Sequence, residues 1–179
     1  MTMEWEIKEK KIEKISDVFD KMKSNLTTKF IRMCATADEI QRWWRPQIGD
    51  LCVSKDDWWK GEEARIFVVG VDISIHDVKT TGGYVWLPTV DDLFEFLLRN
   101  EGIVHQTGVD GVSLRYLMNE FDRFLKQEKV FEEVNWASLP EIAIMFVMFV
   151  LYGKIWDNFS GEWIKIEKED KDEDEDKNN

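Results

Sequence analysis

A run of apolar residues at three- and four-residue spacings is the first clear pattern in the chain. Its members are Trp5, Ile12, Ile15, Phe19, Met22 and Leu26, interrupted once by Lys8. Lys, Glu and Asp fill most of the positions between them, so the apolar side chains share one face of a predicted amphipathic helix. That face packs either on the chain's own domain or on a second copy, which makes residues 5–26 a candidate homo-oligomer contact.

The middle of the chain changes to patterns that are typical of strands. Leu51–Val53, Arg65–Ile75 and Tyr84–Leu87 are rich in Val, Ile and aromatic residues, and Thr81-Gly82-Gly83 is a turn. These stretches predict a small antiparallel sheet of three or four strands. Residues 26–34 fit a strand or a helix, and their sequence does not decide between the two.

Helix starts are marked by capping boxes, in which a hydroxyl residue is followed three positions later by an acid. The three pairs are Thr36 with Glu39, Thr89 with Asp92, and Ser138 with Glu141. The first predicts a short helix through Trp44, stopped by Pro46.

The Thr89 box predicts a helix with an apolar side, and residues 113–127 predict another. The inward side chains expected are Leu93, Phe94, Phe96, Leu97 and Leu98 in the first helix, and Leu114, Leu117, Met118, Phe121, Phe124 and Leu125 in the second.

The helix predicted from Leu139 to Tyr152 is apolar on nearly every side, so we expect it at the centre of the fold. Its continuous apolar run has about half the length that a membrane-spanning helix needs, and no membrane segment is expected. A β-hairpin follows, with strands at 154–156 and 162–166.

These elements predict one α+β domain over residues 28–166, in which a small antiparallel sheet is covered by the central apolar helix. Residues 1–27 are expected to form an amphipathic helical appendage. Residues 167–179 are almost all Asp, Glu, Lys and Asn, with acids in large excess, and we expect a disordered acidic tail.

The composition of the chain disfavours some classes of function and location. The net charge of −12 disfavours general binding to phosphate backbones, although it permits an acidic inhibitor that occupies a nucleic-acid-binding site on another protein. Residues 1–23 are charge-rich and lack the apolar segment of a secretory signal. With only two cysteines, Cys34 and Cys52, the chain is expected to be cytoplasmic.

Tryptophan supplies the candidate binding residues, because the chain has nine and four of them form two adjacent pairs. The candidate partner-binding set is Trp43, Trp44, Trp58, Trp59, Arg42, Arg45 and Lys60, and Lys55 also flanks it. Indole rings at these positions either close the core or contact a partner. The flanking basic residues make a nucleic-acid stacking platform an alternative, which the overall charge opposes.

No arrangement of residues predicts catalysis, a metal or a cofactor. Cys34, Cys52, His76 and His105 lack the spacing of a zinc site, and both cysteines are expected in the core. His76-Asp77 is expected at a strand end, as a surface hydrogen-bonding pair. We therefore expect a protein that is not an enzyme.

Three segments resemble a family of small proteins encoded by phages and prophages of Gram-positive bacteria. They are residues 29–53, with Met33-Cys34 and a Trp-x-Pro-x-x-Gly-Asp entry; residues 85–97, with Trp86-Leu87-Pro88; and residues 138–164, with the late apolar helix and a Lys-x-Trp hairpin. The resemblance implies a phage accessory protein in the host cytoplasm but assigns no activity or functional residue. The leading hypothesis is that it acts through protein–protein contact.

Overall fold

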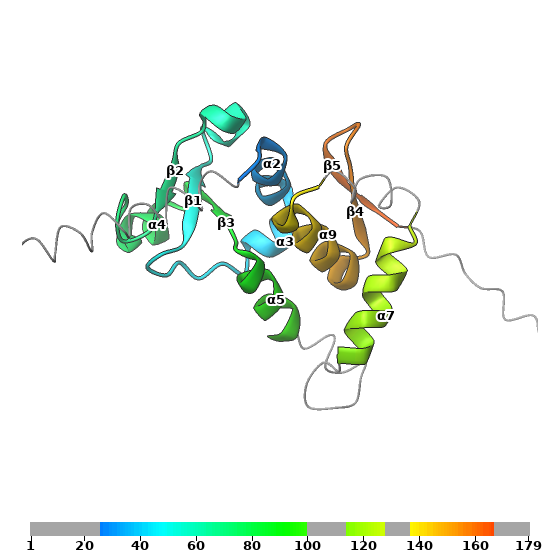
Figure 1. Ribbon diagram of the computed structural model, residues 1–179. Helices are drawn as coiled ribbons and strands as arrows, with labels where there is room; N and C mark the ends of the chain where they lie inside the picture. Colours follow the sequence, from blue (N-terminus) through cyan, green and yellow to red (C-terminus); the bar gives the residue numbers. More distant parts are fainter. Residues whose placement is uncertain (1–25, 100–113, 128–136, 167–179) are drawn as a thin grey trace, which may run out of the picture.

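The computed structural model describes residues 26–99, 114–127 and 137–166, and their helices and strands form an α+β fold (Figure 1). The predicted fold class is therefore confirmed. The predicted amphipathic helix over residues 5–26 and the acidic tail over residues 167–179 fall outside this part of the chain, apart from Leu26.

The elements have the following bounds in chain order: α2 (Thr28–Thr36), α3 (Asp38–Gln41), β1 (Leu51–Ser54), the 3-10 helix η1 (Trp58–Glu63), β2 (Ile66–Val68), α4 (Ile75–Thr81), β3 (Tyr84–Leu87), α5 (Val90–Arg99), α7 (Leu114–Leu125), α9 (Leu139–Tyr152), β4 (Lys154–Asp157) and β5 (Glu162–Lys165).

The first sheet has three antiparallel strands in the order β2-β1-β3. Because side chains alternate between the faces of a sheet, Leu51 and Val53 point into the main core while Cys52 points to the opposite face. Phe67 and Trp86 are the register partners of Cys52, so they lie on that opposite face too. α4 helps to cover it through Val78.

Helix α9 lies at the centre, as its all-round apolar sequence predicts (Figure 1). It packs against α2, α5, α7 and β4, and α2 also packs on β3. Phe146 of α9 meets Phe121 and Phe124 of α7 with ring centroids 5.2 and 5.6 Å apart. No helix in the described ranges is both long enough and apolar enough to cross a bilayer.

Two of the predicted helix caps form, and the third does not. Thr89 and Asp92 hydrogen-bond reciprocally at the start of α5, and the Ser138 amide donates to Glu141 at the start of α9. The capping box predicted at Thr36 is wrong, because α2 runs to Thr36. The Thr36 hydroxyl donates instead to the Arg32 carbonyl. The open choice at residues 26–34 is thereby resolved in favour of a helix.

The prediction of one strand over Arg65–Ile75 is also wrong. The strand stops at Val68, where the Asp72 carboxylate accepts from the Val68 amide and Gly70 turns the chain. Ser74 then caps α4 by accepting from the Asp77 amide, which places His76 and Asp77 in a helix rather than at a strand end.

The predicted apolar sides of α5 and α7 are too wide. Leu93 and Leu97 of α5 are buried, and these residues lie where α5 packs on α9. Phe94 and Leu98 of α5 and Met118 of α7 are exposed, so the buried stripe of each helix is narrower than its apolar composition suggests.

Candidate functional site

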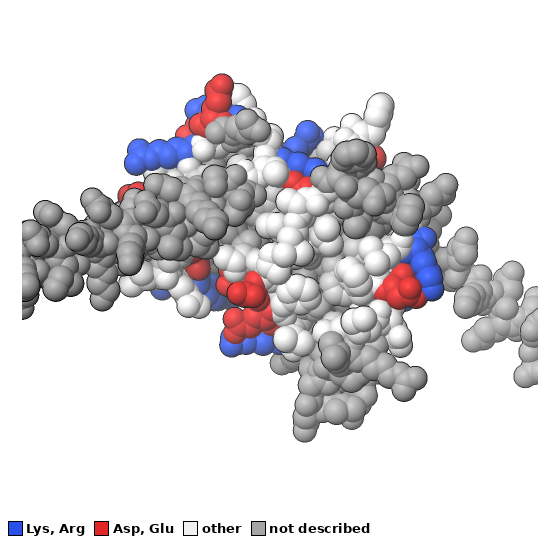
Figure 2. Space-filling model, in the orientation of Figure 1, with Lys and Arg blue, Asp and Glu red and all other residues white. Residues whose placement is uncertain are grey.

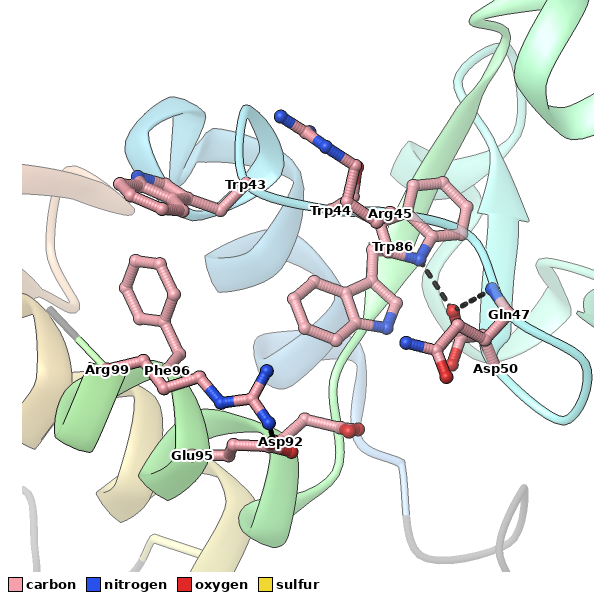
Figure 3. Close-up of a pocket in the computed structure, with 10 residues that line it drawn as sticks. All are labelled: Trp43, Trp44, Arg45, Gln47, Asp50, Trp86, Asp92, Glu95, Phe96 and Arg99. Carbon is pink, nitrogen blue, oxygen red and sulfur yellow. Dashed lines mark hydrogen bonds and ion pairs between the residues drawn. The ribbon is translucent and has the colours of Figure 1, made fainter.

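A cavity of about 370 Å³ opens between the α3–β1 connection, strand β3 and helix α5 (Figure 3). It is lined by Trp43, Trp44, Arg45, Gln47, Asp50, Trp86, Asp92, Glu95, Phe96 and Arg99. We call this cavity the aromatic pocket, because four of its lining side chains are aromatic. The first tryptophan pair therefore takes part in a pocket, together with two aromatic residues that the sequence analysis did not select.

Trp86 forms one wall because of strand alternation. Its neighbours Val85 and Leu87 point to the opposite face of β3. The Trp86 indole is itself a buried member of the main core, at the edge that lines the pocket. The backbone of Trp86 is fixed by Gln41, whose side-chain amide accepts from the Trp86 N–H at 2.8 Å and donates to its carbonyl at 3.0 Å. Since β3 is an edge strand, Gln41 takes the place of a neighbouring strand at this point.

Trp44 continues this wall. Its ring is parallel to that of Trp86, with centroids 6.2 Å apart, and its Nε1 donates to Asp50 at 2.8 Å. The same Asp50 oxygen accepts from the Gln47 amide at 2.8 Å. These bonds hold the connection from α3 to β1 in a fixed shape and place Asp50 at one end of the pocket.

Trp43 forms the opposite wall with Phe96. The two rings meet edge to face, with centroids 5.4 Å apart, yet 55% of Trp43 remains exposed. Trp43 also hydrogen-bonds Tyr152. Burial and the charge of Glu39 raise the pKa of Tyr152 above its ordinary value, and this bond offsets only part of the rise. An indole that is largely exposed but held from two sides is ready to contact a partner.

Charged groups around the pocket are mostly engaged within the protein. Asp92 accepts from Thr89 at the start of α5, and Glu95 pairs with Arg99 on the next turn. The Arg45 guanidinium points away from Trp86 and Phe96 in Figure 3, and it donates to the backbone carbonyls of Arg42 and Trp44. Among the described residues Arg45 has no ion pair.

No protein-family model, curated protein or solved structure matches the chain. The resemblance to phage-encoded proteins therefore stays a prediction. The aromatic pocket has to be interpreted from its own geometry.

The second tryptophan pair does not line the pocket and lies on the 3-10 helix η1. Trp58 packs against the main core, and Trp59 is 67% exposed. The Trp59 Nε1 donates to the Asp56 carbonyl at 2.7 Å, while Lys60 lies over the Trp59 ring and pairs with Asp57.

The candidate partner-binding residues are thus divided by the structure. Trp43, Trp44 and Arg45 line the aromatic pocket, whereas Trp58, Trp59 and Lys60 do not. Arg42 and Lys55 are exposed and also lie outside the lining. Sequence reasoning missed Trp86 and Phe96 as site residues, because the tertiary packing of β3 and α5 brings them to the first tryptophan pair.

The cysteines belong to the interior. Burial raises the pKa of Cys34 well above its ordinary value. Burial and the charges of Asp50 and Asp72 raise the pKa of Cys52 to about 12. Both thiols are therefore protonated at neutral pH and are poor nucleophiles. Within the described ranges, no group of three or more His, Cys, Asp and Glu residues is placed to hold a metal ion.

Proposed function

We propose that the protein acts by protein–protein contact, as a non-enzymatic accessory protein of the phage-encoded kind that its sequence resembles. Its place of action would be the host cytoplasm. In this proposal the aromatic pocket receives an apolar side chain of the partner between Trp43, Trp86 and Phe96. The observation that carries it is the exposed Trp43 indole, fixed by Phe96 and Tyr152 at the edge of the cavity.

The size and lining of the pocket suit one large anchor residue. Protein interfaces are dominated by a few aromatic and arginine side chains that fill pockets on the partner, and here both kinds surround one cavity. About 370 Å³ is at the small end of ligand pockets, which is enough for a single aromatic or aliphatic side chain. Because Trp43 is already held in place, little side-chain entropy is lost on binding.

Two observations favour protein contact over catalysis or nucleic-acid binding. The pocket lining contains no Ser, Cys, His or Lys, and its carboxylates are engaged in a cap, an ion pair and the Trp44 bond. On the face shown in Figure 2, basic and acidic side chains lie together in small groups around an uncharged centre. A phosphate backbone binds to a continuous basic surface instead.

The test compares two substitutions on the same helix. The tagged full-length protein, the Phe96→Asp variant and the Phe94→Asp variant are used to capture proteins from a Gram-positive host lysate, with and without nuclease treatment. Phe96 lines the pocket, whereas Phe94 is exposed and does not line it. We expect one host protein to be retained by the wild type and by Phe94→Asp, and to be lost with Phe96→Asp.

Circular dichroism first establishes that both variants are folded. Retention of the same protein by Phe96→Asp would overturn the proposal that the pocket is the contact. Recovery of nucleic acid, with capture that disappears after nuclease treatment, would favour the stacking-platform alternative. Retention that depends on residues 167–179 and not on Phe96 would favour the acidic inhibitor.

A further inference from the structure

Trp86 is only 8% exposed, and its buried indole nitrogen has no hydrogen-bond partner among the described residues. Figure 3 shows this nitrogen turned toward the end of the pocket where Gln47 and Asp50 lie. A buried N–H without an acceptor is unfavourable, so an occupant that brings an oxygen there would gain affinity. Because the Asp50 carboxylate lies at the same end, a neutral carbonyl is favoured over an anion.

Near Arg45, by contrast, an anionic group of the occupant is favoured. Arg45 is exposed, and no described residue forms an ion pair with it. An occupant with a carboxylate beside its anchor would place that charge near the Arg45 guanidinium, which prefers carboxylate partners. The pocket therefore suits a peptide that has a large aromatic side chain, a backbone carbonyl for Trp86 and an acidic neighbour.

The chain itself contains such a peptide outside the described residues. Glu4-Trp5-Glu6 places an indole between two carboxylates. The roughly 20 residues from Trp5 to Leu26 span about 30 Å as a helix and about 70 Å when fully extended. A domain of this size has a radius of gyration of about 16 Å, so the segment is long enough to reach the pocket of its own chain.

We propose that Trp5 of the chain's own N-terminal segment occupies the aromatic pocket, with Glu4 or Glu6 beside Arg45. This proposal rests on the pocket being a docking site, as the proposed function requires. It adds a regulatory element, because the segment would compete with the partner's anchor. Its covalent attachment gives it an effective concentration of about millimolar, so even a weak contact would keep the pocket largely filled.

Nuclear magnetic resonance of the indole N–H groups tests this in the full-length protein. The Trp86 cross-peak is assigned with Trp86→Phe, which keeps an aromatic ring but removes the donor. We expect Trp5→Ala to shift the Trp86 and Trp43 cross-peaks and to leave that of Trp59 in place. The matched control is Phe131→Ala, because Phe131 also precedes acidic residues outside the described ranges; it should shift neither.

A synthetic peptide of residues 2–9 gives the complementary measurement. Added to the Trp5→Ala protein, it should return the Trp86 cross-peak toward its wild-type position. The same peptide with Lys in place of Glu4 and Glu6 should bind about tenfold more weakly, since the attraction of a carboxylate to Arg45 becomes a repulsion. Equal binding of both peptides would overturn the assignment of Arg45.

The following results would overturn the proposal or its same-chain assignment. An unchanged Trp86 cross-peak in Trp5→Ala, or a shift in Phe131→Ala, would overturn the proposal. A wild-type cross-peak that moves on dilution, together with a dimer in light scattering, would assign the occupant to a second copy and overturn the same-chain assignment. These results are independent of host-protein capture by Phe96→Asp, so the proposed function and the present proposal can fail separately.

Discussion

The two tryptophan pairs differ both in their flanking residues and in their surroundings, since arginines flank the first pair and two aspartates precede the second. In each pair one indole packs inward, Trp44 or Trp58, and the other is largely exposed, Trp43 or Trp59. The first pair meets a second aromatic wall, made of Trp86 and Phe96. Around the second pair, the exposed ring hydrogen-bonds the Asp56 carbonyl and lies beneath Lys60, both near it in sequence.

This difference shows that a tryptophan pair becomes a candidate binding site through what lies opposite it. Residues brought by β3 and α5, about 40 to 50 positions further along the chain, turn the first pair into a pocket. The second pair lies on a short 3-10 helix that packs on α2, and the hydrogen bond and cation contact of its outer indole are to Asp56 and Lys60. Both places have an adjacent tryptophan pair, and the topology decides which of them faces a second aromatic wall.

The largest expected effect belongs to the inner members of both pairs. Trp44→Ala and Trp58→Ala should each lower the free energy of unfolding by about 2–3 kcal/mol, since both rings pack against the core and leave a cavity when removed. Urea unfolding followed by circular dichroism measures this. A loss below about 1 kcal/mol at either position would show that the ring is not part of the packed interior.

Substitutions of the outer tryptophans, Trp43 and Trp59, should distinguish the two regions more clearly than substitutions of the inner ones. Trp43→Ala should cost about 1 kcal/mol, because it removes the edge contact with Phe96 and the bond to Tyr152. Trp59→Ala should change the free energy of unfolding by less than about 0.5 kcal/mol, because its ring is exposed and its contacts are local.

The same urea titrations serve as the measurement for both variants. Equal losses for Trp43→Ala and Trp59→Ala would contradict the view that only the first pair is held by distant parts of the chain. A loss confined to Trp59→Ala would reverse the assignment of the two regions.

Much of the fold could be predicted from the sequence because the relevant signals are local. The Thr89 and Ser138 helix starts depend on neighbours three residues away, and the all-round apolar character of α9 placed it at the centre. The strand prediction over residues 65–75 failed because its apolar composition concealed a turn at Gly70 and a cap at Ser74. Composition indicated burial there but did not indicate where the backbone changes direction.

The candidate site could be predicted only in part, for a different physical reason. Trp43, Trp44 and Arg45 were selected because tryptophan and arginine are frequent in interfaces. Phe96 and Trp86 join them through tertiary packing of α5 and β3, which no local pattern specifies. The Gln41 side chain, which fixes the Trp86 backbone, gave no signal in the sequence at all.

The smallest expected effect concerns one ion pair near each tryptophan pair. Glu39 pairs with Lys154 beside the residues that hold Trp43, with about a quarter of each side chain exposed, whereas Asp57 and Lys60 are more exposed. At pH 7, Glu39→Gln should lower the free energy of unfolding by about 0.5–1 kcal/mol, and Asp57→Asn should have no measurable effect.

The pH dependence gives the sign of this contribution. Burial alone would raise the Glu39 pKa, but the hydrogen bond to Lys154, a backbone hydrogen bond and the charges of Lys154 and Arg42 together hold the pKa below its ordinary value of 4.5. The stabilisation is therefore complete above that value and is lost as the pH falls through the folded-state pKa. Urea unfolding at pH 7 and about pH 3 should show the Glu39→Gln difference only at the higher pH. A difference that persists at low pH would mean that Glu39 contributes to the free energy of unfolding through packing and not through its charge.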